Sequence, residues 1–209
     1  MNEQYPVQFS VEYPERALSR LTTFFRFFTA IPILILLGTL MGSTWGGSYD
    51  DQTTTYAVGG ASFLFLPPLL MLLFRKKYPR WWFDWNLELF RFANRVSIYL
   101  SLMDDRYPST DEQQSVRLDY PYPDAERELG RGMPLVKWLL AIPHYFLLFF
   151  LGIGAFFAVV FAWFAILFTG RYPRGLFEFV EGVYRWTNRV TAYAFLLVTD
   201  RYPPFRLEQ

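Results

Sequence analysis

Two groups of polar side chains in this sequence have the types and spacing to bind anions. An Arg-x-x-Asn-Arg pattern occurs twice, and its members are Arg91, Asn94, Arg95, Arg185, Asn188 and Arg189. Residues three and four apart share one face of a helix, and guanidinium groups form charge-assisted hydrogen bonds with phosphate and carboxylate oxygens. We expect these side chains either to hold anionic lipid headgroups or to pair with Asp105 and Asp200.

A single histidine, His144, is a second chemical candidate. It follows Pro143 in an apolar run, where an ionisable side chain is a candidate for function by default. The matching position in the first half of the chain is Ile33, and the chain has no Cys and no second His to share a metal or haem iron. We expect a structural histidine, with a catalytic or cofactor role as the alternative.

Other patterns of catalytic or ligand-binding residues are missing from the sequence. There is no Ser-His-Asp arrangement, Gly-rich phosphate loop or His-Glu metal spacing, and no carboxylate pair in the apolar runs. The missing carboxylates argue against an ion-coupled carrier. Bases alternate with acids and bulky apolar residues, which argues against nucleic acid. We expect no enzyme activity and no metal or cofactor, structural lipids aside.

The elements that position these residues occur twice, because the chain after about residue 120 resembles the chain before it. Ala-Ile-Pro at residues 30–32 recurs at 141–143, and each half closes with Asp-Arg-Tyr-Pro, at 105–108 and 200–203. The predicted units are repeat 1 at residues 1–108, a linker at 109–115 and repeat 2 at 116–209.

Long uncharged runs indicate membrane segments. We expect four transmembrane helices in two hairpins, at about 22–42 with 56–74 and at about 134–152 with 155–170. Seventeen extra polar and small residues lengthen the first hairpin loop, and Gly152-Ile153-Gly154 is the predicted turn of the second. The helices of the second hairpin are short, so this hairpin either spans the bilayer or is re-entrant.

The basic residues predict the orientation. All 20 Lys and Arg residues fall on one side of the predicted hairpins, and short loops rich in these residues stay in the cytoplasm. We therefore expect a multi-pass protein with both termini in the cytoplasm. The two repeats then share one orientation, with a pseudo-twofold axis along the membrane normal.

The segment after each hairpin predicts a helix that carries a stripe of charges. Residues 81–103 and 176–197 are expected as interfacial amphipathic helices on the cytoplasmic side, because four charges oppose insertion. Aromatic side chains at headgroup level would include Trp81, Trp82, Trp85 and Trp186. The alternative is that the stripes form internal ion pairs within a helical bundle. Short strands at 7–11 and 116–120 precede the hairpins, so the predicted class is an all-α integral membrane protein with two short strands.

Three segments carry a resemblance to a known family. They are Phe-Thr-Gly-Arg-Tyr-Pro-Arg-Gly-Leu-Phe at 168–177, Arg-Trp-Thr-Asn-Arg-Val-Thr-Ala-Tyr at 185–193 and Asp-Arg-Tyr-Pro-Pro-Phe at 200–205. At these motifs the chain resembles the bacterial membrane family filed as domain of unknown function 4389. The resemblance covers both repeats and is strongest in the second. It implies a bacterial inner-membrane protein, with no established activity, cofactor or catalytic residue.

Three classes of function fit these features. The first is a non-enzymatic accessory or scaffold subunit of a larger membrane assembly or homo-oligomer, which packs aromatic and interfacial helices against lipids and partners. The second is a membrane-shaping protein that adds volume to the cytoplasmic leaflet. The third is a small transporter or lipid-handling protein, for which the helices lack a polar lining. In each case cytoplasmic Lys and Arg would attract anionic headgroups.

Overall fold

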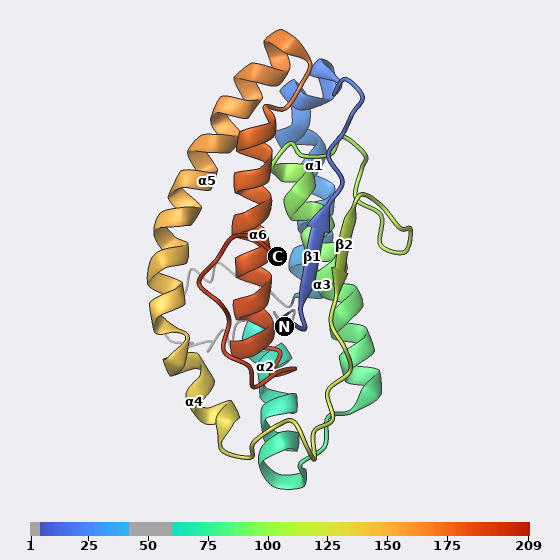
Figure 1. Cartoon of the computed structure of the whole chain (residues 1–209). Coiled ribbons are helices and arrows are strands. Elements are labelled where there is room, and N and C mark those ends of the chain that lie inside the picture. Colours follow the sequence, from blue (N-terminus) through green and yellow to red (C-terminus); the bar gives the residue numbers. More distant parts are fainter. Residues whose placement is uncertain (1–4, 42–59) are drawn as a thin grey trace, which may run out of the picture.

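The chain folds into three layers: a two-stranded sheet, a central helix pair and an outer group of apolar helices (Figure 1). The structure, a computed structural model, describes residues 5–41 and 60–209. Its elements are β1 (Gln8–Val11), α1 (Arg20–Leu40), α2 (Gly60–Leu70), the π-helical turn η1 (Met71–Arg75), α3 (Arg80–Leu100), β2 (Val116–Asp119), α4 (Met133–Leu140), α5 (Ile142–Thr169) and α6 (Arg174–Ala194).

The central layer consists of α3 and α6, which run in opposite directions (Figure 1). Each helix has 21 residues and starts directly after a Tyr-Pro pair, with Pro79 and Pro173 as N-caps in the extended conformation. Proline has no backbone N–H and a fixed φ, so it ends the preceding loop without losing a helical hydrogen bond. The segments after the two helices also match, because Leu102 and Leu197 both adopt positive φ, at 64° and 58°.

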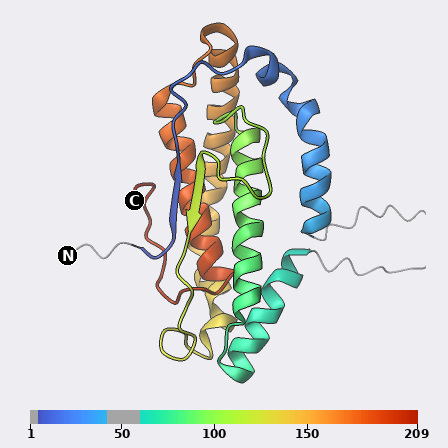
Figure 2. The ribbon, with the colours of Figure 1, turned by 90° about the vertical axis from the view of Figure 1, so that its right-hand side faces the viewer.

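The sheet layer pairs the two predicted strands, which the structure confirms. β1 and β2 are antiparallel, with Phe9 opposite Leu118. Alternate side chains are buried against α3 and α6, whereas Gln8, Arg117 and Asp119 face outward. This is the period of two expected for a strand with one covered face. Figure 2 shows the strands lying over the middle of the helix pair.

The outer layer corrects the prediction for the second hairpin. Helix α5 runs unbroken for 28 residues, through the predicted turn at Gly152-Ile153-Gly154. The predicted pair of helices at 134–152 and 155–170 is therefore wrong. A glycine inside a helix costs only about 0.5–1 kcal/mol relative to alanine, which the surrounding Phe, Leu and Ala residues outweigh. Gly154 instead permits close packing, because a Cβ there would lie 3.3 Å from the Phe179 ring.

The first hairpin is described only in part. Helix α1 lies within two residues of the predicted span at 22–42, and α2 with η1 covers most of the span at 56–74. The predicted loop between them lies outside the described residues. By length and composition, α1 and α5 are apolar enough to cross a membrane.

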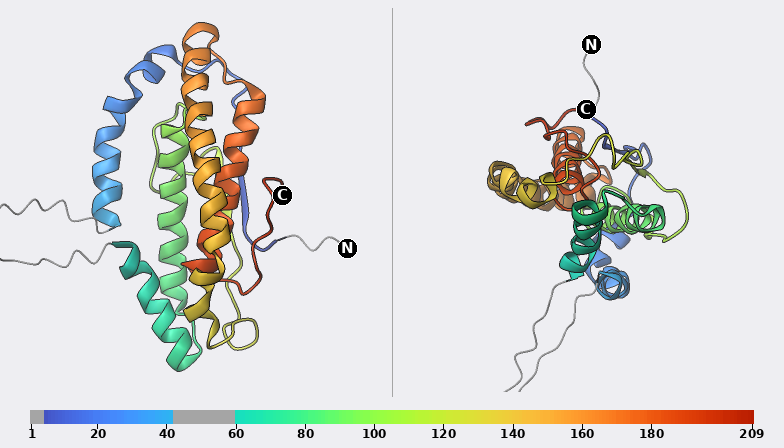
Figure 3. Two further views of the ribbon diagram at one scale, coloured as in Figure 1. Left: turned by 90° about the vertical axis from the view of Figure 1, so that its left-hand side faces the viewer. Right: turned by 90° about the horizontal axis from the view of Figure 1, so that it is seen from below.

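Small side chains bring the outer layer close to the central one. Ala158, Ala162 and Ile166 of α5 are buried against the main core, together with the inner faces of α3, α6 and the strands. A second contact joins α1 to α5, where the indole of Trp163 donates to the carbonyl oxygen of Thr23 at 3.3 Å. Seen from below, α1, α2 and α5 lie on the side of the central pair away from the strands (Figure 3).

Candidate functional site

The first arginine of each Arg-x-x-Asn-Arg pattern fastens a strand to a helix. Arg91 donates from Nε to the carbonyl oxygen of Leu118 at 2.9 Å, and Arg185 donates from Nε to that of Phe9 at 3.0 Å. Each guanidinium also forms an ion pair with a glutamate on its own helix. Arg91 lies 2.6 Å from Glu88, and Arg185 lies 2.5 Å from Glu181. The two side chains are directed at the sheet and thereby fix its position over the helices.

The second arginine of each pattern is buried and holds a loop. Arg95 donates to the carbonyl oxygens of Ser109 and Thr110, at 2.9 and 3.2 Å. Arg189 holds the C-terminal segment in the same way. It donates to the carbonyl oxygens of Arg206 at 3.1 Å and Glu208 at 2.7 Å. Removal from water lowers the pKa of both side chains, that of Arg189 to about 10.

The two asparagines meet where α3 and α6 pack together. Asn94 donates to Oδ1 of Asn188 at 3.0 Å, and Asn188 donates to Oδ1 of Asn94 at 2.7 Å. Each amide also donates to the carbonyl oxygen four residues earlier, that of Phe90 or Tyr184. The pair is thus a reciprocal bridge at the centre of the molecule.

The predicted pairing of these arginines with Asp105 and Asp200 is not the arrangement found. Asp105 accepts from the backbone N–H of Ser19 at 3.3 Å and from Arg16. Asp200 accepts from the backbone N–H of Gly130 at 2.7 Å. Both carboxylates therefore anchor the segment before a helix of the outer layer.

The four arginines of the predicted interfacial helices are bonded to protein atoms, whereas Glu88 and Glu178 on the same helices are exposed. The position of these helices relative to a membrane stays a prediction. The strands, the linker and the C-terminal segment take the place of lipid headgroups, which is the alternative of internal pairing within a bundle. The reason is geometric. The two short strands pair with each other, and their carbonyl oxygens lie within hydrogen-bond distance of Arg91 and Arg185. Periodicity within one helix does not reveal a strand more than 20 residues away.

The four tryptophans expected at headgroup level divide into an exposed pair and a buried pair. Trp81 and Trp85 at the start of α3 are 70% and 42% exposed, which suits side chains at a membrane interface. Trp82 and Trp186 are buried in the protein core.

His144 is fully buried in an aromatic cluster. Its Nδ1 accepts a hydrogen bond from the indole N–H of Trp186 at 3.0 Å, and its ring stacks on Phe205 with centroids 4.1 Å apart. Because an indole only donates, Nδ1 must be unprotonated and a neutral ring carries its proton on Nε2. These contacts favour a structural role.

Two buried bases were missed by the sequence reasoning. Arg26 of α1 lies 4.2 Å from the Tyr99 ring centroid and donates to the carbonyl oxygen of Asp104 at 2.5 Å. Lys137 of α4 lies 5.3 Å from the Tyr193 ring centroid and donates to the carbonyl oxygen of Thr199 at 2.7 Å. A signal was present, because both halves have a base four residues before Ala-Ile-Pro.

The outer layer exposes many large apolar side chains. Phe27 of α1 is 72% exposed, and Phe161 and Phe168 of α5 are 65% and 78% exposed. Two apolar grooves cross this surface, one of about 360 Å³ between α1, α5 and the end of α3, and one of about 470 Å³ beside Gly152. The surface contains the groups expected of a lipid or protein contact.

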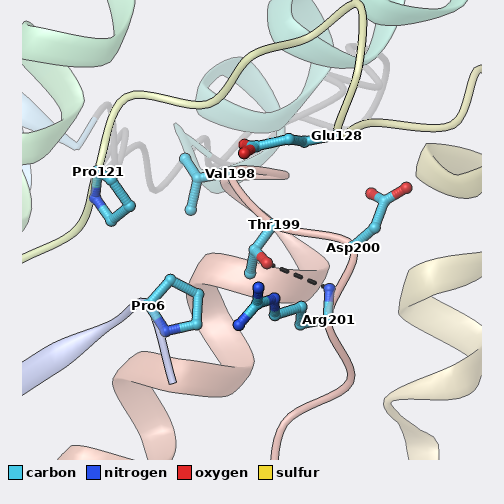
Figure 4. A pocket seen from close by; sticks show the side chains of 7 residues that line it. All are labelled: Pro6, Pro121, Glu128, Val198, Thr199, Asp200 and Arg201. Atoms are coloured by element: carbon cyan, nitrogen blue, oxygen red, sulfur yellow. Dashed lines mark hydrogen bonds between the residues drawn. The ribbon is translucent and has the colours of Figure 1, made fainter. Parts of the chain in front are cut away.

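A hollow of about 460 Å³, lined by both polar and apolar side chains, lies next to the end of α6 (Figure 4). Its walls are Pro6, Pro121, Glu128, Val198, Thr199, Asp200 and Arg201. Asp200 is already bonded to Gly130 and forms an ion pair with Lys137 at 2.7 Å. Among the described residues, no group of three or more His, Asp or Glu side chains is placed to hold a metal ion.

Comparison with known proteins finds one family match, within the second half of the chain. Residues 133–206 match a family described as a domain of unknown function, DUF4389. The matched stretch spans α4, α5, α6 and the segment that carries Phe205. No curated protein and no solved structure matches the chain. The predicted family is thus confirmed for this stretch, and membership of residues 1–108 stays a prediction.

Proposed function

We propose that the protein is a non-enzymatic accessory or scaffold subunit of the bacterial inner membrane. The observation that carries this proposal is the exposed apolar layer. The most apolar part of α5 is only 11% buried, whereas the core helix of a soluble protein is mostly buried. Apolar patches of this kind mark contacts with a membrane or another protein.

The polar groups support a structural role. The six residues of the Arg-x-x-Asn-Arg patterns bond to strand, loop and partner-helix atoms, and His144 lies in an aromatic cluster. Such groups hold the layers together and leave few side chains free for a reacting substrate. Residues on the outer surface then carry the interaction with lipids and partners.

The partners we propose are membrane lipids and other membrane-protein subunits, including further copies of this chain. Exposed bases beside the outer layer replace the buried arginines as contacts for anionic headgroups. They include Arg20, Arg171 and Arg174 at one end of α5 and Arg127 and Arg131 at the other. Both termini are then cytoplasmic. The predicted second hairpin requires a turn inside α5, so we do not retain the topology of four crossings.

We also propose that residues 1–108 and 116–209 are two copies of one unit. The support is a set of contacts made by residues at matching positions. Tyr122 donates to the carbonyl oxygen of Tyr78, as Tyr13 does to that of Tyr172. Arg80 lies over the Tyr122 ring, as Arg174 does over the Tyr13 ring. Together with Arg91 and Arg185, these pairs relate the copies by a twofold axis between α3 and α6.

Purification from native membranes in lipid nanodiscs, followed by mass spectrometry, tests the proposed function. We expect a stoichiometric protein partner or a homo-oligomer, with co-purified anionic lipids. A Phe149→Ser, Phe161→Ser variant should lose the partner, whereas Arg117→Gln on the sheet face is the matched control and should retain it. A monomer without any partner would contradict the scaffold role. Loss of a measurable activity in His144→Ala alone would also contradict it, in favour of a catalytic one.

A further inference from the structure

We infer that the outer layer lies within the cytoplasmic leaflet, with α5 parallel to the membrane plane, and that the described part of the chain does not cross the bilayer. This inference rests on the proposed membrane association and specifies its partner as one leaflet. Four features of the described residues support it: the bases at the two ends of α5, the position of the sheet, the length of α5 and the matched orientation of the halves.

Basic residues flank α5 at both ends. Arg127 and Arg131 precede α4 and α5, and Arg171 and Arg174 follow. The start of α1 joins the second group, because the N–H of Leu18 donates to the carbonyl oxygen of Gly170 at 2.8 Å. If α5 crossed the membrane, one group would lie outside the cell, against the preference of such loops for the cytoplasm. If α5 lies in the plane, both groups stay on the cytoplasmic side.

The sheet lies halfway along the molecule. Arg91 and Arg185, each at the middle of a 21-residue helix, bond to the strands. The side chains of Glu12, Arg117 and Asp119 around the strands are 60%, 74% and 75% exposed. A bilayer perpendicular to α5 would place these charges and both open sheet edges near its centre, where neither is tolerated in contact with lipid.

The dimensions of α5 fit one leaflet better than a complete crossing. At about 1.5 Å per residue its 28 residues extend about 42 Å, against about 30 Å of hydrocarbon. To keep all 28 residues of this apolar helix within the hydrocarbon, a crossing would require a tilt of about 45°, beyond the usual range of up to about 40°; with less tilt, apolar ends would lie among the headgroups. Lying flat, a helix about 10–12 Å in diameter fits into one leaflet, which has about 15 Å of hydrocarbon.

An in-plane orientation also places each layer in a suitable solvent. The apolar helices α1 and α5 lie away from the strands (Figure 3), so the sheet, the linker and the C-terminal segment all face the cytoplasm. The axis that relates Asn94 to Asn188 and Phe9 to Leu118 then runs along the membrane normal. Both halves present the same face to the membrane, as the distribution of bases requires.

Single cysteines test this orientation, because the chain has no Cys. Gly132→Cys and Gly175→Cys stand before α4 and after α5, at exposed positions where an added Cβ meets no atom within 4 Å. A membrane-impermeant maleimide should label both in inverted inner-membrane vesicles and neither in spheroplasts. Gln8→Cys on the sheet is the matched control for the cytoplasmic side. Labelling of either glycine position in spheroplasts would overturn the inference.

A depth measurement provides the second readout. Spin labels at Phe146, Phe157 and Phe168, exposed positions eleven residues apart on one face of α5, should report the same depth in the leaflet. A crossing helix would instead place Phe157 deepest. If the protein is recovered from the soluble fraction, the proposed membrane function fails as well. A membrane-bound protein with labels at unequal depth overturns only the orientation.

Discussion

At the scale of single residues, the reciprocal amide bridge between Asn94 and Asn188 determines how α3 and α6 meet. The structure places both amides at the interface, where each N–H₂ group donates to two protein oxygens and each Oδ1 accepts from the partner amide. A buried polar group that loses its partner costs about 1–3 kcal/mol, whereas removal of both partners can be nearly neutral.

We expect Asn188→Leu to lower the free energy of unfolding by about 1–3 kcal/mol, because it leaves the Asn94 amide unsatisfied. Leucine has the branched shape of asparagine, so Asn94→Leu, Asn188→Leu together should recover most of this loss. Denaturant unfolding in detergent micelles measures the double-mutant cycle. If the stability losses of the two single variants add in the double variant, with a coupling energy below about 1 kcal/mol, the amide bridge does not stabilise the contact between α3 and α6.

Leu197 combines an unfavourable backbone conformation with complete burial. A positive φ costs a non-glycine residue about 1–2 kcal/mol, whereas a buried leucine side chain contributes about 2–5 kcal/mol. We therefore expect Leu197→Gly to destabilise the protein by about 1–3 kcal/mol, although it relieves the backbone. Gly170→Ala, at φ 74°, is the control for backbone strain, because an added Cβ would lie at ordinary contact distances of 3.7 Å from Ala17 and 3.9 Å from Arg20. A stabilised Leu197→Gly variant would show that the strain outweighs the burial.

At the scale of elements, the continuity of α5 is the feature that most changes the interpretation of the sequence. Gly152→Pro should destabilise the protein by about 3 kcal/mol or more, because proline in a helix interior removes a hydrogen bond and clashes with the preceding turn. The control is Arg174→Pro at the first residue of α6, where proline is tolerated. Thermal unfolding followed by circular dichroism measures both. A tolerated Gly152→Pro would restore the predicted hairpin turn.

Local sequence patterns were sufficient to predict several strands and helices. They did not predict which segments these elements contact. The alternation in residues 7–11 predicted β1, and the charge stripes predicted α3 and α6, whose starts lie within two residues of the predicted starts at 81 and 176. The predicted turn at Gly152-Ile153-Gly154 was wrong because glycine signals both a turn and a close contact, and only the position of Phe179 against Gly154 shows the contact. The six residues of the Arg-x-x-Asn-Arg patterns make matching contacts in the structure. Their ligands were not predicted, because those ligands are carbonyl oxygens, which every residue carries.

At the scale of the whole molecule, the two opposite faces differ in the solvent they suit. Four exposed charges near the sheet, on Glu12, Glu88, Arg117 and Asp119, would each cost about 2.5–3.5 kcal/mol at a bilayer centre. Each large apolar side chain on the outer face gains about 1.5–3 kcal/mol when it leaves water. The molecule is thus amphipathic as a unit, although neither α1 nor α5 is strongly so.

Membrane affinity should therefore depend on the outer face alone. We expect Phe161→Glu to weaken binding to vesicles of mixed neutral and anionic lipid by at least about 10-fold, because an apolar contact is lost and a charge enters the leaflet. Arg117→Glu on the sheet face should change binding little, since its exposed pair with Glu12 contributes about 1 kcal/mol or less. Vesicle flotation measures both. Equal losses in the two variants would indicate non-specific attraction to the surface.

The pairing of β1 with β2 has a consequence for the order in which the chain folds during its synthesis. β1 is among the first described residues of the chain, yet its partner ends at Asp119. When the ribosome has made α1 and α3, it has not yet made Leu118, whose carbonyl oxygen accepts the hydrogen bond from Arg91. The apolar helices are therefore exposed before the polar layer closes, and contacts between distant parts of a chain form slowly. Contact of α1 with the membrane should precede closure of the sheet, so the leaflet serves as the first surface on which the fold assembles.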